Sequence, residues 1–466
     1  MHVRALNSWI RTPLLLMAAV EAAVLFSSIY VAAMITCGSV ANCELLMGPI
    51  APKALLITGL VLVSLIAMGL YQFHQRFWYR EAVLRVLVGL TAGFLAAAVV
   101  FYAFPEFNIE RPVANVAYGY SLILILAARL YFVRTVDTNI FRRRTIIYGA
   151  GERASALMDL RRRADRRGFR IVGRVAAPGD TIVGDRSEVL LTDGKSVKDI
   201  ALERKADEII IAMDEKRGNL PVRELLDARL NGIDVVELIE FLERETGKIR
   251  VDLVKPGWLI FSSGFRISKF RQFSERTVDL FVSGLLMAVA WPVMLLVAAA
   301  IKVEDGVSAP VFYRQRRVGK GSVPIEVLKF RSMAVNAEAD GKAVWATKDD
   351  QRITRVGACL RKTRLDELPQ VLNVLKGEMS LVGPRPERPE FVEELKKSIP
   401  YYDERHAVKP GVTGWAQLKY SYGASEEDAT EKLHYDLYYI KNQSLMLDIM
   451  IILQTVEVVL WGKGAR

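Results

Sequence analysis

The chain has 466 residues, which is too long for one ordinary hydrophobic core, so two to four domains are expected. Hydrophobic residues make up 52% of it and charged residues 25%, which together indicate a membrane protein with a substantial soluble part. The net charge of +11 favours an anionic partner, either phospholipid headgroups or phosphorylated substrates, and not nucleic acid, because stretches that interleave basic and aromatic residues are absent.

Four apolar runs in the first third of the chain are each close to the roughly 20 residues that span a bilayer. They cover residues 13–36, 51–71, 83–104 and 113–133. Basic residues lie before the first run, between the second and third, and after the fourth. Since basic loops stay in the cytoplasm, both ends of a four-span domain over residues 1–140 are expected there. Cys37 and Cys43 fall in the first outward loop, where a disulfide and two free thiols fit the sequence equally well.

Residues 141–246 alternate strand-like and helical stretches, which indicates a parallel α/β layer. The expected strands lie in RRTIIYGAG, FRIVGRV, ADEIIIAM and GIDVVEL, and a helix is expected from about Arg153 to Arg166. The first strand runs into GAGERA, residues 149–154, a GxGxxA variant of the dinucleotide-binding turn. No acidic residue ends the strand FRIVGRV, where a ribose-binding carboxylate belongs. We therefore expect a Rossmann-like module with a structural or regulatory role, and bound NAD is the alternative.

Two more apolar runs follow a linker, residues 247–275, in which short strands are expected at KIRVDL and WLIFSS. The first run, residues 277–301, is long enough to span, but basic clusters flank it on both sides, against the distribution expected for a spanning helix. Pro292 in its middle kinks a helix. The expected structure is a re-entrant hairpin on the cytoplasmic face, and a fifth span is the alternative. The second run, residues 444–461, is either an interfacial helix or a helix packed on its own domain.

Three stretches in the last third carry candidate phosphate-binding side chains. PVFYRQRRVG offers Gln315 and Arg317, EVLKFRSM ends in Lys329 and Arg331, and SLVGPRPE holds Arg385 between Pro384 and Pro386. The two prolines stiffen the loop that presents Arg385, whose planar guanidinium suits bidentate phosphate recognition. Taken singly, each arginine is better explained as a contact with solvent or lipid headgroups, so only the combination carries weight.

A fourth stretch, TRLDELPQ (363–370), places Asp366 and Glu367 together in a strongly basic neighbourhood. Asp366 suits a helix N-cap, and leucines follow at helical spacing, so the pair is expected at a helix N-terminus. The helix dipole and adjacent arginines would then depress the pKa of both carboxyls. An ionised carboxylate in such a place can be a nucleophile or a Mg²⁺ ligand, whereas a capping residue with a salt bridge is the plain alternative.

Together these stretches resemble the bacterial sugar transferases, also described as monotopic phosphoglycosyl transferases or polyprenyl-phosphate hexose-1-phosphate transferases. The resemblance covers about residues 276–466 and rests on PVFYRQRRVG, LKFRSM, ITRVGACLRKTRLDELPQVLNVLKGEMSLVGPRPE, KPGVTGWAQL and HYDLYYIKNQSLMLDI. The four-span start and the Rossmann-like middle are similar to the family's large form, which suggests a homodimer. The ending VVLWGKGAR is similar to the branch associated with exopolysaccharide biosynthesis.

The resemblance implies a transmembrane helical bundle, a Rossmann-like α/β module and a membrane-associated α/β catalytic domain, residues 276–466, with a re-entrant helix. It places the enzyme in the bacterial inner membrane, with this domain on the cytoplasmic face. The implied reaction transfers hexose 1-phosphate from a UDP-sugar to undecaprenyl phosphate, with release of UMP and a covalent aspartyl-phosphosugar intermediate.

The resemblance also implies roles for single residues. By position, Asp366 matches the nucleophile and Glu367 matches the residue that ligates Mg²⁺. Pro292 matches the proline that breaks the re-entrant helix. The cations that match positions near the phosphates and nucleotide are Lys329, Arg331 and Arg385, and Gln315 and Arg317 are further substrate-binding candidates.

Two other classes of protein share parts of this organisation. A membrane-bound nucleotide-sugar dehydratase or epimerase needs a Tyr-x-x-x-Lys pair, and none of the 16 tyrosines has a lysine four residues on. A non-catalytic scaffold for glycan assembly would not need the acidic pair. The sequence therefore favours the transferase, and it leaves the oligomeric state and the sugar open, with glucose and galactose expected from the family.

Overall fold

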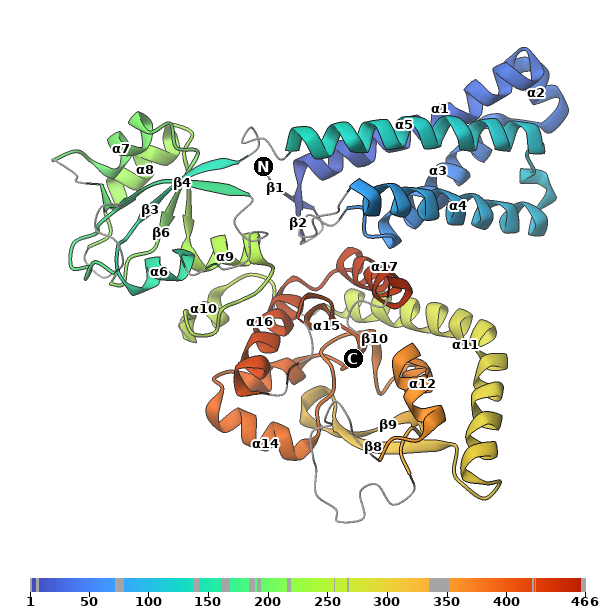
Figure 1. Cartoon of the computed structure of the whole chain (residues 1–466). Helices are drawn as coiled ribbons and strands as arrows, with labels where there is room; N and C mark the ends of the chain where they lie inside the picture. Colours follow the sequence, from blue (N-terminus) through green and yellow to red (C-terminus); the bar gives the residue numbers. More distant parts are fainter. Residues whose placement is uncertain are drawn as a thin grey trace. The chain divides into compact units, whose positions relative to one another are not determined.

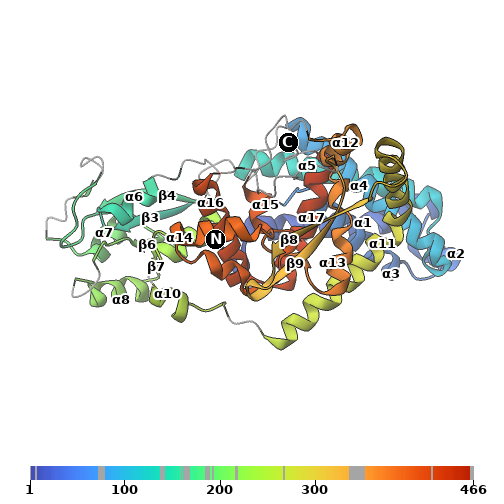
Figure 2. The same cartoon turned by 90° about the horizontal axis from the view of Figure 1, so that it is seen from below.

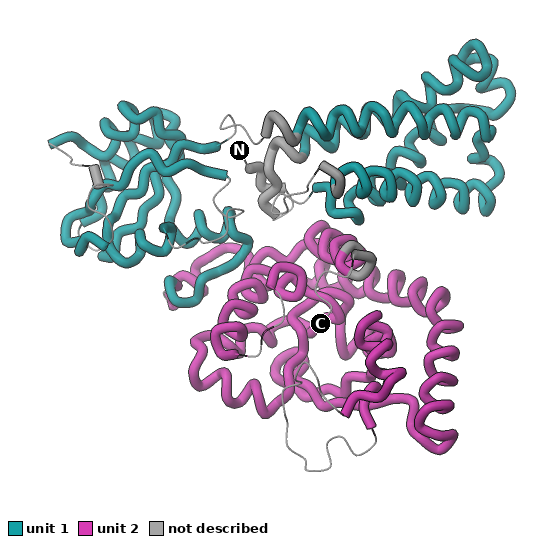
Figure 3. Tube along the Cα trace, in the orientation of Figure 1, with its two compact units in different colours: residues 1–5, 9–253 teal, residues 6–8, 254–466 magenta. Residues whose placement is uncertain are grey.

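The structure, a computed structural model, describes residues 2–5, 8–71, 79–136, 142–158, 160, 168–183, 189–190, 194–215, 219–254, 256–265, 268–334, 352–420, 423 and 425–461. The chain divides into two units (Figure 3). One holds residues 1–5 and 9–253, and the other holds residues 6–8 and 254–466. Each unit contains its own buried apolar clusters.

The first unit contains a helical bundle. A two-stranded sheet of β1 (His2–Ala5) and β2 (Ser8–Arg11) precedes α1 (Thr12–Cys37), α2 (Val40–Met47), α3 (Ile50–Ala67), α4 (Tyr79–Ala103), the short turn η1 (Pro105–Phe107) and α5 (Arg111–Val136). The four long helices are apolar and long enough to cross a bilayer, which confirms the four runs expected from the sequence. Leu25, Ile57 and Leu90 are buried between the helices, whereas Val99 and Ile123 point outward and are mostly exposed. Apolar side chains on the outside of a bundle are the pattern of a surface that faces lipid.

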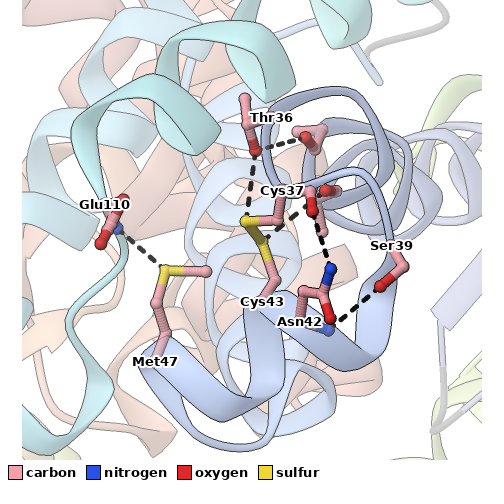
Figure 4. Close-up of a disulfide and its surroundings, with 9 residues drawn as sticks. Thr36, Cys37, Ser39, Asn42, Cys43, Met47 and Glu110 are labelled. Carbon is pink, nitrogen blue, oxygen red and sulfur yellow. Dashed lines mark hydrogen bonds between the residues drawn. A yellow bond between two sulfur atoms is a disulfide. The ribbon is translucent and has the colours of Figure 1, made fainter.

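The loop between α1 and α3 is closed by a disulfide (Figure 4). Cys37 ends α1 and bonds to Cys43 in α2, with the two Cα atoms 5.5 Å apart. The Ser39 hydroxyl accepts the backbone N–H of Asn42 and caps α2, while the Asn42 amide donates to the Cys37 carbonyl at 3.2 Å. Of the two alternatives that the sequence left open, the structure therefore forms the disulfide.

The rest of the first unit is a five-stranded parallel sheet. Its strands are β3 (Arg143–Tyr148), β4 (Phe169–Val175), β5 (Val189–Leu190), β6 (Glu208–Ile211) and β7 (Asp234–Glu237), in the order β5-β4-β3-β6-β7. The helices are α6 (Glu152–Met158), α7 (Val197–Glu203), α8 (Val222–Leu230) and α9 (Leu238–Thr246). Helices α7 and α8 cover one face and α6 and α9 the other (Figure 1), and a separate apolar cluster fills each interface. The predicted parallel α/β layer is thus confirmed; most of the predicted helix beyond Met158 lies outside the described residues.

The linker between the α/β sheet and the long apolar helix lacks the short strands expected there. The stretch KIRVDL forms an irregular turn, and WLIFSS begins inside the helix α10 (Pro256–Phe261), so the expected short strands are wrong. Branched and aromatic residues favour strands only where a partner strand is present, and Pro256 suits the first turn of a helix.

The long apolar helix of the second unit is α11 (Lys269–Asp305). It is longer than the predicted 277–301, has 37 residues and contains Pro292. Its ribbon turns a corner part-way along (Figures 1 and 2), which fits the hydrogen bond that an internal proline removes. One helix of this length would measure about 55 Å if straight, well above the roughly 30 Å of a bilayer core.

The remaining elements surround a small β-hairpin. They are β8 (Phe312–Val318), η4 (Lys320–Ser322), β9 (Pro324–Phe330), α12 (Arg355–Thr363), η5 (Leu365–Glu367), α13 (Gln370–Lys376), β10 (Ser380–Val382), α14 (Pro389–Ser398), η6 (Tyr402–Ala407), β11 (Gly411–Thr413), α15 (Trp415–Lys419), α16 (Glu426–Asn442) and α17 (Leu445–Trp461). Strands β8 and β9 pair antiparallel, and β10 and β11 pair parallel. Helix α17 buries Leu447 and Ile451 in its own unit and exposes Leu445 and Ile449, so it packs on one face and leaves an apolar face outside.

Candidate active site

The acidic pair lies in η5, a single 3₁₀ turn between α12 and α13. Helix α12 ends at Thr363, and its C-cap Arg364, whose backbone has the left-handed φ of 61°, turns the chain into η5. The N-cap of α13 is Pro369, so the prediction that Asp366 caps this helix is wrong. Asp366 and Glu367 lie within the 3₁₀ turn that directly precedes the helix.

Glu367 is held between two cations from distant parts of the chain. Its Oε1 accepts from Lys329 Nζ at 2.9 Å and from Arg385 Nη2 at 2.6 Å, and Arg385 Nη1 lies 3.4 Å from Oε2. Burial would raise the pKa of Glu367, but Arg385 and Lys329 together hold it well below its usual range. Glu367 is therefore a fixed, ionised carboxylate.

Asp366 differs from its neighbour although it is equally close to the cations in sequence. Its side chain is 8% exposed, and no hydrogen bond or ion pair restrains its carboxylate within the described part of the chain. Burial and the adjacent Glu367 charge raise the pKa of Asp366. The prediction that both pKa values are depressed is thus confirmed for Glu367 and wrong for Asp366, because the cations that would stabilise a second charge are paired with Glu367.

The position of Lys329 depends on a residue that sequence reasoning missed. Asn373, fully buried in α13, accepts the N–H of Leu328 at 2.9 Å and donates to the carbonyl of Glu326 at 2.7 Å. Its amide thus pairs with the backbone of β9 as a neighbouring strand would, and it fixes α13 beside the strand that carries Lys329. The available signal was a polar side chain on the apolar face of a predicted helix, where a buried amide needs partners.

The other candidate substrate-binding residues fall into two groups. Arg317 donates to Gln315 Oε1 at 2.6 and 3.0 Å and to the Pro386 carbonyl at 3.0 Å, so Gln315 and Arg317 support the loop that carries Arg385. Arg331 follows β9, and its Nη1 is buried without a hydrogen-bond partner among the described residues. The structure therefore brings Lys329, Arg385 and the acidic pair together, and Arg331 takes no part in the ion pairs described for Glu367.

Both ends of α11 hold the helices that flank the acidic pair. Near its start, Arg276 donates at 2.6 Å to the carbonyls of Val374 and Leu375, which lie in the last turn of α13. Near its end, the Glu304 carboxylate accepts the N–H groups of the first two residues of α12 at 2.8 and 2.9 Å. These contacts satisfy backbone groups that have no hydrogen-bond partner within the two helices. The positive charge of Arg276 at a helix C-terminus and the negative charge of Glu304 at a helix N-terminus also match the helix dipoles in sign. The apolar helix is thus a structural part of the site.

The glycine turn of the α/β sheet is filled by the chain's own carboxylates. Asp214 accepts the N–H groups of Glu152 and Arg153 at 3.1 and 2.9 Å, and Asp180 accepts that of Ala150 at 2.9 Å. A Cβ on Gly151 would lie 1.8 Å from an Asp214 oxygen. In dinucleotide-binding proteins these backbone groups face a pyrophosphate. Here acidic side chains have taken its place.

Comparison with known proteins now identifies the family. A family model described as bacterial sugar transferase matches residues 270–462, from the start of α11 to the end of α17. UDP-glucose:undecaprenyl-phosphate glucose-1-phosphate transferase of Xanthomonas campestris pv. campestris is 30% identical over 440 residues, 90% of this chain and 89% of that protein. This chain belongs to the bacterial sugar transferase family.

Two other relatives carry different sugars in their names. UDP-N-acetylgalactosamine-undecaprenyl-phosphate N-acetylgalactosaminephosphotransferase of Aeromonas hydrophila is 41% identical over 244 residues, 52% of this chain and 56% of that protein. Undecaprenyl-phosphate galactose phosphotransferase of Salmonella typhimurium is 29% identical over 416 residues, 85% of this chain and 84% of that protein. This bacterial sugar transferase is thus similar to relatives with three different donor sugars and one lipid acceptor.

Proposed function

We propose that this bacterial sugar transferase moves hexose 1-phosphate from a UDP-sugar to undecaprenyl phosphate and releases UMP. The observation that carries the proposal is the contrast within the acidic pair: Glu367 is clamped by Lys329 and Arg385, while the carboxylate beside it is buried and unrestrained. A carboxylate that only capped a helix or balanced charge would be the clamped one. An unrestrained carboxylate next to a cationic cradle suits a nucleophile for a phosphorylated substrate.

The chemistry proceeds in two displacements. An ionised oxygen of Asp366 attacks the β-phosphorus of the UDP-sugar, the bond from that phosphorus to the bridging oxygen breaks, and UMP leaves with the bonding pair. A phosphate oxygen of the lipid then attacks the same phosphorus, and the acyl-phosphate bond to Asp366 breaks and restores its carboxylate. Lys329 and Arg385, which both contact Glu367, would offset the charge of the diphosphate and of the leaving UMP.

The donor set fits Mg²⁺ only together with substrate. The described residues contain no cluster of three or more acidic, histidine or cysteine side chains that could hold a metal alone. Mg²⁺ usually binds through one or two carboxylates plus substrate phosphates, and Glu367 would supply one carboxylate. A bound Mg²⁺ would neutralise the diphosphate charge. Glu367 would keep its orientation for this role through its contacts with Lys329 and Arg385.

We further propose that α11 is a re-entrant membrane helix and that the catalytic unit lies on the cytoplasmic face of the inner membrane. The contacts of Arg276 with α13 and of Glu304 with α12 support this, because they join the two ends of α11 to neighbouring helices of the same unit. The disulfide between Cys37 and Cys43 supports the orientation, since such bonds persist outside the cytoplasm.

Single-cysteine labelling in intact cells tests this topology. In a Cys359→Ser background, cysteines at the exposed positions Lys269 and Val307 should both be protected from an impermeant reagent. A cysteine at Leu45, in α2 two residues beyond the disulfide and 87% exposed, should react as the positive control. Reaction at only one of the two test positions would mean that α11 spans the membrane.

The Rossmann-like module is assigned a structural role in this proposal. The strand order, which reverses beside β3, supports the Rossmann-like description, and the self-filled glycine turn argues against NAD. The product would enter exopolysaccharide biosynthesis as its first membrane intermediate, and the large form suggests a homodimer. A screen of UDP-sugars by UMP release from the purified full chain, with Mg²⁺ and undecaprenyl phosphate, tests the reaction and identifies the sugar. Absence of UMP with every donor would overturn the proposal.

A further inference from the structure

The loop after β10, residues 383–388, is fixed by hydrogen bonds to its backbone carbonyls. Two of its members are prolines, which have no N–H, so the loop depends on its carbonyls. The carbonyls of four consecutive residues, 384–387, each accept a hydrogen bond. The donors are Gly411 N at 2.9 Å, Arg405 Nη2 at 3.1 Å, Arg317 Nη1 at 3.0 Å and Val318 N at 2.9 Å. The loop that presents Arg385 to Glu367 is therefore fixed at four consecutive residues.

Arg405 is the donor to the carbonyl of Arg385 itself. Its guanidinium is 4% exposed and also donates to Asp436 Oδ2 at 2.9 and 3.2 Å and to the Tyr402 hydroxyl at 2.7 Å. These partners come from η6, from α16 and from the loop, and only the planar fork of arginine reaches all three in fixed directions. Lysine at this position keeps the charge opposite Asp436 but has no such fork.

Stability alone is a weak explanation for this buried pair. Removing Arg405 and Asp436 from water carries a large desolvation penalty, and apolar residues of similar volume are often as stabilising. What apolar residues cannot do is hold the Arg385 carbonyl. A misplacement of a binding group by about 1 Å can cost on the order of 100-fold in rate.

We propose that Arg405, oriented by Asp436, is a positioning residue that sets the place of the Arg385 guanidinium at Glu367. The inference rests on the role of Arg385 in the proposed function. Arg405 acts through the backbone of Arg385, so its contribution exists only while the Arg385 side chain is present.

A double-mutant cycle separates positioning from general structural support. Arg405→Lys should lower kcat/KM for the UDP-sugar by about 10- to 100-fold, mostly in kcat. In an Arg385→Ala background the same change should lower it by less than about 3-fold. Arg244→Lys, which alters a buried pair with Glu208 in the α/β sheet, is the matched control and should leave both values unchanged. Equal losses in the two backgrounds, or full activity of Arg405→Lys, would overturn the proposal.

A measurement without turnover keeps the inference distinct from the proposed function. Hydrogen exchange at the amides of Val318, Gly383 and Gly411, the backbone N–H groups that are hydrogen-bonded in or to this loop, should be at least about 10-fold faster in Arg405→Lys than in wild type, and unchanged in Arg244→Lys. If Arg405→Lys does not fold, Tyr402→Phe removes one partner of the same guanidinium and should give the same change in smaller measure. Unchanged exchange overturns the positioning role even if no UMP is ever released, while fast exchange with an inactive wild type would reject only the proposed reaction.

Discussion

Acid should destabilise the catalytic unit through one histidine beside the Arg385 loop. His406 lies in η6 next to Arg405 and is 7% exposed. Burial, and then the adjacent Arg405 cation, lower its pKa from 6.5 to about 4, although Asp403 acts in the opposite direction. Folded His406 is therefore neutral down to about pH 4, whereas the unfolded chain takes up a proton below about pH 6.5.

The size and sign of the effect follow from proton linkage. Because the unfolded state binds the extra proton, the stabilisation is complete above pH 6.5 and is lost as the pH falls toward 4. Between pH 7 and pH 5 this single group removes about 2 kcal/mol from the free energy of unfolding. For a unit of this size that corresponds to a fall of roughly 4–8 °C in Tm.

Thermal unfolding of the full chain in nanodiscs, followed at pH 7, 6 and 5, measures this effect. Gln does not titrate, so from pH 7 to pH 5 the Tm of His406→Gln should fall by roughly 4–8 °C less than the Tm of wild type. This difference does not depend on the Tm of the variant at pH 7. Other groups contribute to both proteins alike, and the difference between their two slopes isolates His406. If Tm falls equally with pH in wild type and in His406→Gln, the titration of His406 does not destabilise the unit in acid.

Three further predictions concern the helix cap formed by Glu304, the metal, and the glycine turn of the α/β sheet. Glu304→Gln should lower Tm by about 2–4 °C through loss of a charged helix cap, whereas Asp305→Asn on the same turn should not; equal shifts would deny the cap its role. Removal of Mg²⁺ with EDTA should abolish UMP release, and Glu367→Gln should raise the Mg²⁺ concentration needed for half activity; undiminished release in EDTA would exclude the metal. Calorimetry should detect no NAD binding to wild type, and Asp214→Ala should lower Tm; micromolar NAD binding would contradict the self-filled turn.

Sequence patterns predicted the elements best where one physical property dominates. The four spans and the parallel strands follow from length and hydrophobic periodicity, and both are present in the structure. The strand expected at WLIFSS failed because β propensity depends on a partner strand, and residues 256–261 form a helix instead. Helix α11 extends past its apolar run because its polar ends pack on other elements.

The site was predictable in its residue types and not in its pairing. Adjacent carboxylates among arginines indicated a phosphate site, but spacing along the chain does not tell which carboxylate the cations meet. That choice is made by Asn373 and Arg405, which place Lys329 and Arg385 from separate elements. Both act on backbone groups, the N–H of Leu328 and the carbonyl of Arg385, and the sequence does not tell which backbone group a buried side chain meets. The opposite pKa shifts of Asp366 and Glu367 are a product of this three-dimensional pairing.

Peptide mass spectrometry shows whether Asp366 becomes covalently bonded to the sugar phosphate. Purified full chain is mixed with Mg²⁺ and its UDP-sugar, without lipid acceptor, and quenched in acid. The account predicts about one UMP per chain and a hexose phosphate on the peptide that contains Asp366, which disappears when undecaprenyl phosphate is added. Asp366→Asn should give neither the adduct nor UMP. An adduct on another residue, or UMP release by Asp366→Asn at the wild-type rate, would mean that Asp366 is not the nucleophile.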